Sequence, residues 1–186
     1  MASEVAAPAA PGATPEHKNP VESIAGQFPH LSTGDRALLR RMYLTESHEA
    51  DGVVIRLMYR SGLTAPSDPR AFAPWRLLAH CAALLSGTGG LYPHSTGRRL
   101  GAALQETGLS ENRLMRLTSA RGSGLEAQVI RAVRMLAQKG QAPVNLHTLF
   151  ALIGHDPEKA EAARIRIAQD YYAAKARSKE GTSSDD

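Results

Sequence analysis

The apolar residues of this chain recur at helical intervals over most of its length. Between residues 123 and 139, Leu125, Val129, Val133 and Leu136 follow one another at i, i+4, i+8 and i+11. This spacing places their side chains on one face of an α-helix. Alternation with a period of two is rare, so the pattern offers no convincing strand. The hydrophobic pattern therefore predicts an all-α fold.

Capping and breaking residues divide this pattern into about eight helices. Ser32 with Asp35 is typical of a helix start, and so is Asp156 before a proline. Pro74 is expected in the first turn of a helix, where a missing N–H leaves no bond unmade. The expected elements are a helix after Ser32, residues 50–60, a helix opening at Pro74, residues 96–107, 110–120 and 123–139, a short helix over 146–153, and a long helix from Pro157.

Composition and connection lengths predict two small helical bundles between polar ends. Residues 1–27 are rich in Ala and Pro and have few large apolar side chains, so we expect a disordered leader with structure beginning near Phe28. Residues 178–186 are polar and are expected to form a disordered tail. An N-terminal helical bundle over 28–90 and a C-terminal basic bundle over 91–177 should meet near residues 87–96.

Charge changes the picture, because the chain's formal charge of +4 understates its folded part. Both predicted disordered ends are acidic, and the residues between 33 and 177 carry 20 basic and 12 acidic side chains. The folded part is therefore near +8. Such an excess of positive charge favours a polyanionic partner.

The basic residues concentrate between residues 97 and 140. Arg113 and Arg116 are one helical turn apart, as are Arg131 and Arg134, and a turn advances the axis by ~5.4 Å. Guanidinium groups at this interval can contact neighbouring phosphates of one strand, although carboxylates of a protein partner would suit the same geometry. Few acids lie nearby in the sequence, which favours nucleic acid. The candidate nucleic-acid-binding residues are Arg98, Arg99, Arg113, Arg116, Arg121, Arg131, Arg134 and Lys139.

A second group of basic residues lies earlier, in the helix expected after Ser32. Arg36, Arg40 and Arg41 lie opposite the apolar stripe of that helix. They could extend the basic surface, or they could be solvated charge on an amphipathic helix. We treat them as second-tier candidates for nucleic-acid binding.

Residues suited to catalysis or metal binding form no recognisable constellation. The seven histidines include no i, i+4 pair on a helix, and His147 and His155 straddle a helix boundary. The single cysteine, Cys81, lies in an apolar helix and is expected to be buried. Glu158 and Glu161 adjoin basic residues, as in solvated ion pairs. The sequence predicts a non-enzymatic binding protein without metal or cofactor.

Apolar runs are too short for a membrane span, which needs ~20 residues, and the N-terminus lacks the apolar core of a signal peptide. The chain is therefore expected to be a soluble cytoplasmic protein with no membrane partner.

Two kinds of nucleic-acid binding fit the basic segment. Residues 100–117 resemble a helix-turn-helix, with Gly108 at the turn and a second helix that displays Arg113 and Arg116. That helix offers few side chains suited to base edges, Asn112 being the main exception, and the basic residues extend well beyond it. Binding to the phosphate backbone fits better, and a helix-turn-helix regulator of duplex DNA is the alternative.

Five segments follow one another along the chain: LSTGDRALLRRMY (residues 31–43), PWRLLA (74–79), HSTGRRLGAAL (94–104), SENRLMRL (110–117) and RIRIAQDYYAA (164–174). Together and in this order they resemble the CasB family, the small subunit of the type I-E CRISPR surveillance complex called Cascade. The resemblance covers nearly the whole part expected to be ordered.

The resemblance implies a non-catalytic, all-helical subunit in antiviral defence. Its implied partners are the backbone and large subunits of Cascade, guide RNA, target DNA and a second copy of itself stacked head to tail. The basic face would stabilise the R-loop and hold the displaced strand, using the candidates named above. A purely structural adaptor without nucleic-acid contacts is a third hypothesis.

Overall fold

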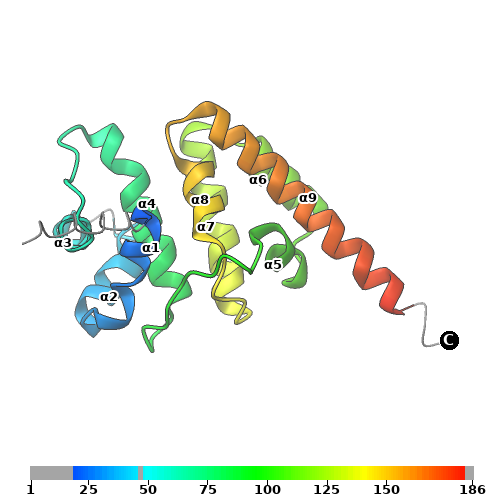
Figure 1. Cartoon of the computed structure of the whole chain (residues 1–186), viewed down its shortest axis with the longest axis horizontal. Helices are drawn as coiled ribbons and strands as arrows, with labels where there is room; N and C mark the ends of the chain where they lie inside the picture. The colour runs from blue at the N-terminus through cyan, green and yellow to red at the C-terminus, as the bar shows by residue number, and fades with distance from the viewer. Residues whose placement is uncertain (1–18, 46–47, 183–186) are drawn as a thin grey trace, which may run out of the picture.

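The computed structural model describes residues 19–45 and 48–182, which fold almost entirely into helices (Figure 1). In chain order the elements are α1 (Pro20–Ala25), the 3₁₀ helix η1 (Phe28–His30), α2 (Thr33–Arg41), α3 (Glu49–Arg60), α4 (Pro69–Leu85), α5 (Leu100–Glu106), α6 (Glu111–Ser119), α7 (Gly122–Gln138), α8 (Leu146–Ile153) and α9 (Pro157–Thr182). Within this described part there is no strand, only an isolated parallel bridge between His94 and Val144. The predicted all-α fold is confirmed.

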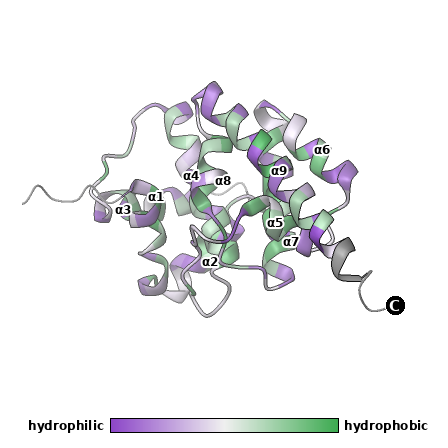
Figure 2. Cartoon of the chain, turned by 45° about the vertical axis from the view of Figure 1, so that its right-hand side comes forward, coloured by the Kyte–Doolittle hydropathy of each residue, from purple (hydrophilic) through white to green (hydrophobic). Residues whose placement is uncertain are grey.

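The helices are arranged around α4, α7 and α8. Figure 1 shows α1 to α4 on one side of the molecule, α5, α6 and α9 on the other, and α7 and α8 between them. Helix α4 packs against α7 and α8, while α9 packs against α5 and α8. Buried side chains from both sides join in one hydrophobic cluster, and Figure 2 shows apolar positions, in green, among the helices in the middle of the molecule. The division into two bundles stays a prediction.

Two predicted helix starts are confirmed by their caps. The Ser32 hydroxyl oxygen accepts a 3.0 Å hydrogen bond from the backbone N–H of Asp35 at the start of α2. The Asp156 carboxylate accepts 3.1 Å bonds from the N–H groups of Glu158 and Lys159 at the start of α9. These side chains satisfy donors that have no partner inside the helix.

The predicted start of α4 at Pro74 is wrong, because Pro74 lies inside the helix. Helix α4 begins at Pro69, and the Asp68 side chain caps it through the N–H of Arg70. Inside a helix, Pro74 cannot donate to the carbonyl of Arg70, four residues earlier. His155 makes up this loss by donating from Nε2 to the Arg70 oxygen at 2.7 Å. A side chain from the loop between α8 and α9 thus satisfies the carbonyl that the interior proline leaves without a donor.

Order also begins earlier than the predicted start near Phe28. Helix α1 lies inside the range expected to be a disordered leader, and its Val21 and Ile24 are buried against the core. Asn19 caps this helix, which packs against α3 and α8. At the other end, α9 runs past residue 178 to Thr182. Residues 1–18 and 183–186 of the predicted leader and tail lie outside the described residues.

Two buried histidines fasten separate parts of the fold through their ring nitrogens. His80 of α4 donates from Nδ1 to the carbonyl of Leu39 in α2 at 2.7 Å. His94 accepts at Nδ1 from the backbone N–H of Leu146 at 3.1 Å, which joins the loop before α5 to the start of α8. Desolvation lowers the pKa of both rings, because burial disfavours the charged imidazolium.

Helices α5 and α9 approach each other closely at Gly101. Gly101 is buried, and a Cβ built at this position would overlap the carbonyl oxygen of Ile167 and lie 2.9 Å from the Cβ of Asp170. The missing side chain lets the two helix backbones approach directly. This contact places α9 across the end of the molecule.

We expect Gly101→Ala to lower the free energy of unfolding by about 1–3 kcal/mol, because the added methyl group must displace α9. Gly124→Ala is the matched control, since a Cβ there meets nothing within 4 Å. This control in a helix should leave stability unchanged or raise it by up to about 1 kcal/mol. Urea denaturation of both variants measures the difference, and equal stability of the two would contradict the contact.

The two buried histidines should make the fold less stable in mild acid. The unfolded chain binds protons on these rings below about pH 6.5, whereas the folded chain, with lowered pKa values, does not until the pH is lower still. The free energy of unfolding should therefore fall as pH decreases from about 6.5, by at most about 1.4 kcal/mol per pH unit for each histidine. Urea denaturation between about pH 7.5 and 5 tests this slope.

The variant His94→Asn isolates the contribution of His94 to the loss of stability in acid. The Asn Oδ1 can still accept from the N–H of Leu146, but the side chain has no proton to gain. The variant should show a shallower loss of stability in acid. A slope identical to that of the unaltered chain would exclude His94 as a contributor.

Candidate nucleic-acid interface

Four of the predicted arginines lie together along a groove between α6 and α7. Arg113 and Arg116 come from α6, and Arg131 and Arg134 come from α7. The groove has a volume of about 440 Å³. Its other lining residues are Leu109, Leu117, Gln128, Ala132, Met135 and Gln138. We call it the α6–α7 groove.

The packing of the two helices directs these arginines into the groove. Leu114 and Leu117 of α6 are buried, as are Val129 and Val133 of α7. Because these apolar faces point into the core, the arginines on the other faces of α6 and α7 lie at the surface, beside the groove between the two helices. Helical spacing of three residues puts each pair of arginines one turn apart, as predicted.

The four groove arginines form no ion pair within the described side chains. None of them pairs with a carboxylate of residues 19–45 or 48–178. Arg113 Nη1 donates to the sulfur of Met135 at 4.0 Å. Three of the four are exposed, and Arg134 is half-buried. Their positive charge is therefore available to an anionic ligand.

Arg98 and Arg99 lie apart from the groove and are ion-paired. Arg98 bonds Glu106 at 2.8 Å, and Arg99 bonds Asp170 at 3.2 Å. Both line a shallow cavity of about 340 Å³ together with Arg177 near the end of α9. Their charges are partly compensated within the chain, so they form a weaker anion site than the groove.

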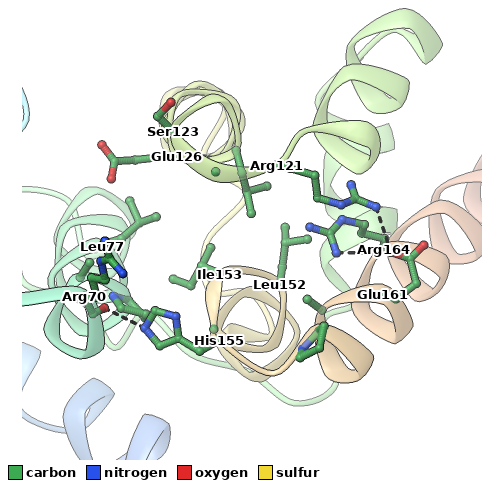
Figure 3. Close-up of a pocket in the computed structure, with 17 residues that line it drawn as sticks. Arg70, Leu77, Arg121, Ser123, Glu126, Leu152, Ile153, His155, Glu161 and Arg164 are labelled. Carbon is green, nitrogen blue, oxygen red and sulfur yellow. Dashed lines mark hydrogen bonds and ion pairs between the residues drawn. The ribbon is translucent and has the colours of Figure 1, made fainter.

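Arg121 points to a different part of the molecule. Its guanidinium group bonds Glu161 at 3.0 Å and the carbonyl oxygens of Thr118 and Ala120 at 3.0 Å. It lines a larger cavity between α4, α7, α8 and α9 (Figure 3). The sequence grouped Arg121 with the groove arginines, but the turn between α6 and α7 separates them.

The remaining candidates do not line the groove. Lys139 is exposed at the C-terminal cap of α7. Arg36 is half-buried and donates from Nη1 to the carbonyl of Leu31 at 2.8 Å, so it serves the fold. Arg40 and Arg41 also belong to α2, and Arg41 bonds the carbonyl of Ala37 at 3.3 Å. Binding of nucleic acid by any candidate stays a prediction.

Three further polar residues, which were not predicted from the sequence, also line these surfaces. Gln128 and Gln138 line the α6–α7 groove, and Arg177 lines the cavity beside Arg98. A signal was present for the glutamines, because positions 128, 131, 135 and 138 follow one helical face. Arg177 gave no such signal, since its distance in sequence from Arg98 hides their proximity.

The predicted helix-turn-helix exists as α5 and α6 joined by a turn at Gly108, which has φ of 79°. Its second helix does not stand alone, however. Arg113 and Arg116 face a groove whose other wall is α7, and α5 is packed beneath α9. A recognition helix must enter the major groove of DNA with its side chains free, so this packing suits backbone contact better.

One group of metal-ligating side chain types occurs in the described part of the chain, formed by Glu22, His94 and His147, whose ligand atoms lie within 4.8 Å of one another. Its geometry disfavours a metal. Because His94 Nδ1 accepts from the N–H of Leu146, its neutral ring carries the proton on Nε2 and has no lone pair there to donate. Glu22 instead pairs with His147 at 2.9 Å and joins α1 to α8.

The single cysteine lies in the hydrophobic core. Cys81 is fully buried, and burial raises the pKa of its thiol, so the reactive thiolate is disfavoured. No helix in residues 19–45 and 48–182 combines the length and apolar character that crossing a bilayer requires.

Comparison with known proteins identifies a family. The model of the family described as CRISPR-associated protein Cse2 matches residues 35–172, which include both helices of the groove. Among solved structures, the chain is similar to the crystal structure of CasB from Thermobifida fusca, with 14% sequence identity and a TM-score of 0.48. That match covers 80% of this chain and 97% of the other. No curated protein matches the chain.

Proposed function

Because the chain belongs to the CRISPR-associated Cse2 family, as its predicted resemblance to CasB indicated, we propose that it is a non-catalytic subunit of a type I-E Cascade complex. In this proposal it contacts the sugar-phosphate backbone of guide RNA and target DNA, and it stabilises the R-loop and the displaced strand. Its protein partners are the backbone and large subunits and a second copy of itself.

The observation that supports this function is the set of unpaired arginines in the α6–α7 groove. Four guanidinium groups on two helices line one open groove, and no carboxylate of the described residues neutralises them. Phosphates are the ligands that such groups bind best, through charge-assisted hydrogen bonds. Gln128 and Gln138 add neutral donors along the same line.

Backbone contacts are sufficient for this role. In an RNA-guided complex the guide supplies sequence choice by base pairing, and the opened duplex is close to energetic balance with the closed one. A modest gain from a few phosphate contacts therefore shifts the equilibrium toward the open state. Because phosphate contacts carry no sequence information, the groove needs no base-reading side chains.

We expect the double variant Arg131→Glu/Arg134→Glu to shorten the lifetime of the R-loop by about tenfold or more in a reconstituted complex. Reversal removes two phosphate contacts and adds repulsion, and tenfold corresponds to about 1.4 kcal/mol. The lifetime is measured by competition with unlabelled target after the R-loop has formed. Circular dichroism should show unchanged helix content, because neither side chain belongs to the buried face of α7.

Arg60→Glu/Arg166→Glu is the matched control for this variant. Arg60 and Arg166 are exposed on α3 and α9, lie outside the groove, and have no ion-pair partner among the described residues. The control changes net charge by the same amount. An equal loss of R-loop lifetime in both variants would assign the effect to net charge and not to the groove.

The salt dependence of binding distinguishes the competing functions. Log affinity of the purified chain for unrelated single strands should fall with log salt at about −0.7 for each phosphate contact. Arg113→Gln and Arg116→Gln should each reduce that slope by about 0.7. Fluorescence anisotropy at about 50 to 300 mM salt measures it. Tight binding to one duplex sequence would favour the regulator, and indifference to these variants would favour the structural adaptor.

A further inference from the structure

A second cavity, separate from the α6–α7 groove, lies where α4, α7, α8 and α9 meet (Figure 3). Its volume is about 850 Å³, within the range of sites that bind sizeable ligands. Much of its wall is apolar, contributed by Pro74 and Leu77 of α4 and by Leu152 and Ile153 of α8. The proposed backbone binding makes no use of this space.

A buried, incompletely satisfied charge lies in the wall of this cavity. Arg164 of α9 is only 6% exposed, and its guanidinium group carries five N–H donors. Nη1 reaches Glu161 and Nη2 reaches the carbonyl of Ala120, both at a long 3.4 Å. Nε is buried and has no hydrogen-bond partner among the described residues. A buried charge in this condition is costly unless a further anion satisfies it.

Arg121 increases the positive charge at the same place. Its Nη2 bonds the Glu161 oxygen that also faces Arg164, at 3.0 Å, so two guanidinium groups share one carboxylate. Figure 3 shows the Arg121 and Arg164 side chains next to each other beside Glu161. Burial, and secondarily the charge of Arg121, lowers the pKa of Arg164. The pair retains an excess of positive charge.

The first turn of α7 lies beside the same cavity and has unpaired N–H groups. Helix α7 is 17 residues long, and no side chain caps its N-terminus. Gly122 and Ser123 line the cavity, and the N–H groups of residues 122 to 124 make no hydrogen bond with other described residues. The helix dipole adds a partial positive charge there. Together with the buried Arg164, this forms an anion-binding corner in an apolar cavity.

We propose that this cavity docks a segment of a protein partner in which a bulky apolar side chain adjoins a carboxylate. The apolar side chain fills the space between α4 and α8, and the carboxylate binds Arg164, Arg121 and the first turn of α7. This inference goes beyond the proposed nucleic-acid contacts. Only the identity of the partner as another subunit of the complex rests on the proposed function, namely that the chain is part of a Cascade complex.

A nucleic-acid strand suits this cavity less well than the proposed peptide. Each phosphate is flanked by sugars and further phosphates, and the apolar wall would remove these groups from water without hydrogen bonds. A leucine or phenylalanine side chain beside an aspartate or glutamate matches both halves of the site. Glu126 also lines the cavity, but Figure 3 shows its carboxylate directed away from the two arginines.

A small probe tests the site directly in the full chain. N-acetyl-leucine carries an isobutyl group and one carboxylate, and N-acetyl-leucinamide is its uncharged match. We expect N-acetyl-leucine to shift the NMR signals of Arg164 Nε–H and of the backbone N–H groups of residues 122 to 124 in ¹⁵N titrations at constant ionic strength. These shifts should be at least about fivefold larger than those caused by N-acetyl-leucinamide. Equal shifts by both would overturn the carboxylate requirement. Shifts by inorganic phosphate but not by the acid would assign the site to phosphate.

Two variants locate the carboxylate. Ser123→Asp places a fixed negative charge in the first turn of α7, where the helix dipole favours it, so the fold should be as stable as before or more so. It should weaken binding of N-acetyl-leucine at least about tenfold, whereas Ser123→Asn should not. Arg164→Gln should act like the aspartate variant, with Arg166→Gln on the exposed face of α9 as its control. Retained binding in Arg164→Gln would overturn the proposal.

The assembled complex tests the partner. Ser123→Asp should lower incorporation of the chain into a reconstituted Cascade complex about tenfold, while its oligonucleotide binding stays unchanged. Normal incorporation together with unchanged self-association would overturn docking at this cavity and leave the groove proposal intact. Altered self-association in sedimentation velocity with normal incorporation would instead identify a second copy of this chain as the occupant. Weakened oligonucleotide binding would assign the cavity to nucleic acid.

Discussion

Burial of the apolar face of α7 fixes the position of both proposed binding surfaces. Val129, Val133 and Leu136 are at most 1% exposed, and each contributes roughly 1.5–3 kcal/mol by leaving water. With this face held against α4, the helix cannot rotate. Its outer face then forms the α6–α7 groove, and its first turn opens onto the cavity beside α9.

Between residues 33 and 177, the 12 acidic residues are too few to neutralise the 20 basic ones, and the fold distributes them unevenly. Glu106 and Asp170 neutralise Arg98 and Arg99, and Glu161 is divided between two guanidinium groups at the cavity. The groove receives no carboxylate from the described residues. The charge excess seen in composition is therefore concentrated at particular places and is not spread evenly over the surface.

The two proposed surfaces suit different ligands because their surroundings differ. The groove is lined by arginines and glutamines, which match a continuous chain of phosphates. The cavity is mainly apolar with a charged corner, which matches one side chain and one carboxylate. A subunit that does not recognise a nucleotide sequence must be positioned in the complex by contacts with other proteins. On these proposals the cavity supplies position and the groove supplies affinity for the backbone.

Sequence by itself determined the helical class, the capped starts at Ser32 and Asp156, and the turn-by-turn pairing of the groove arginines, because each depends on residues close along the chain. Only tertiary structure decided features that depend on distant partners. Pro74 is tolerated inside α4 because His155 serves the carbonyl of Arg70. The proposed role of Arg164 in binding could not be predicted from sequence. Its side chain is buried by residues of several helices that come together only in the folded chain.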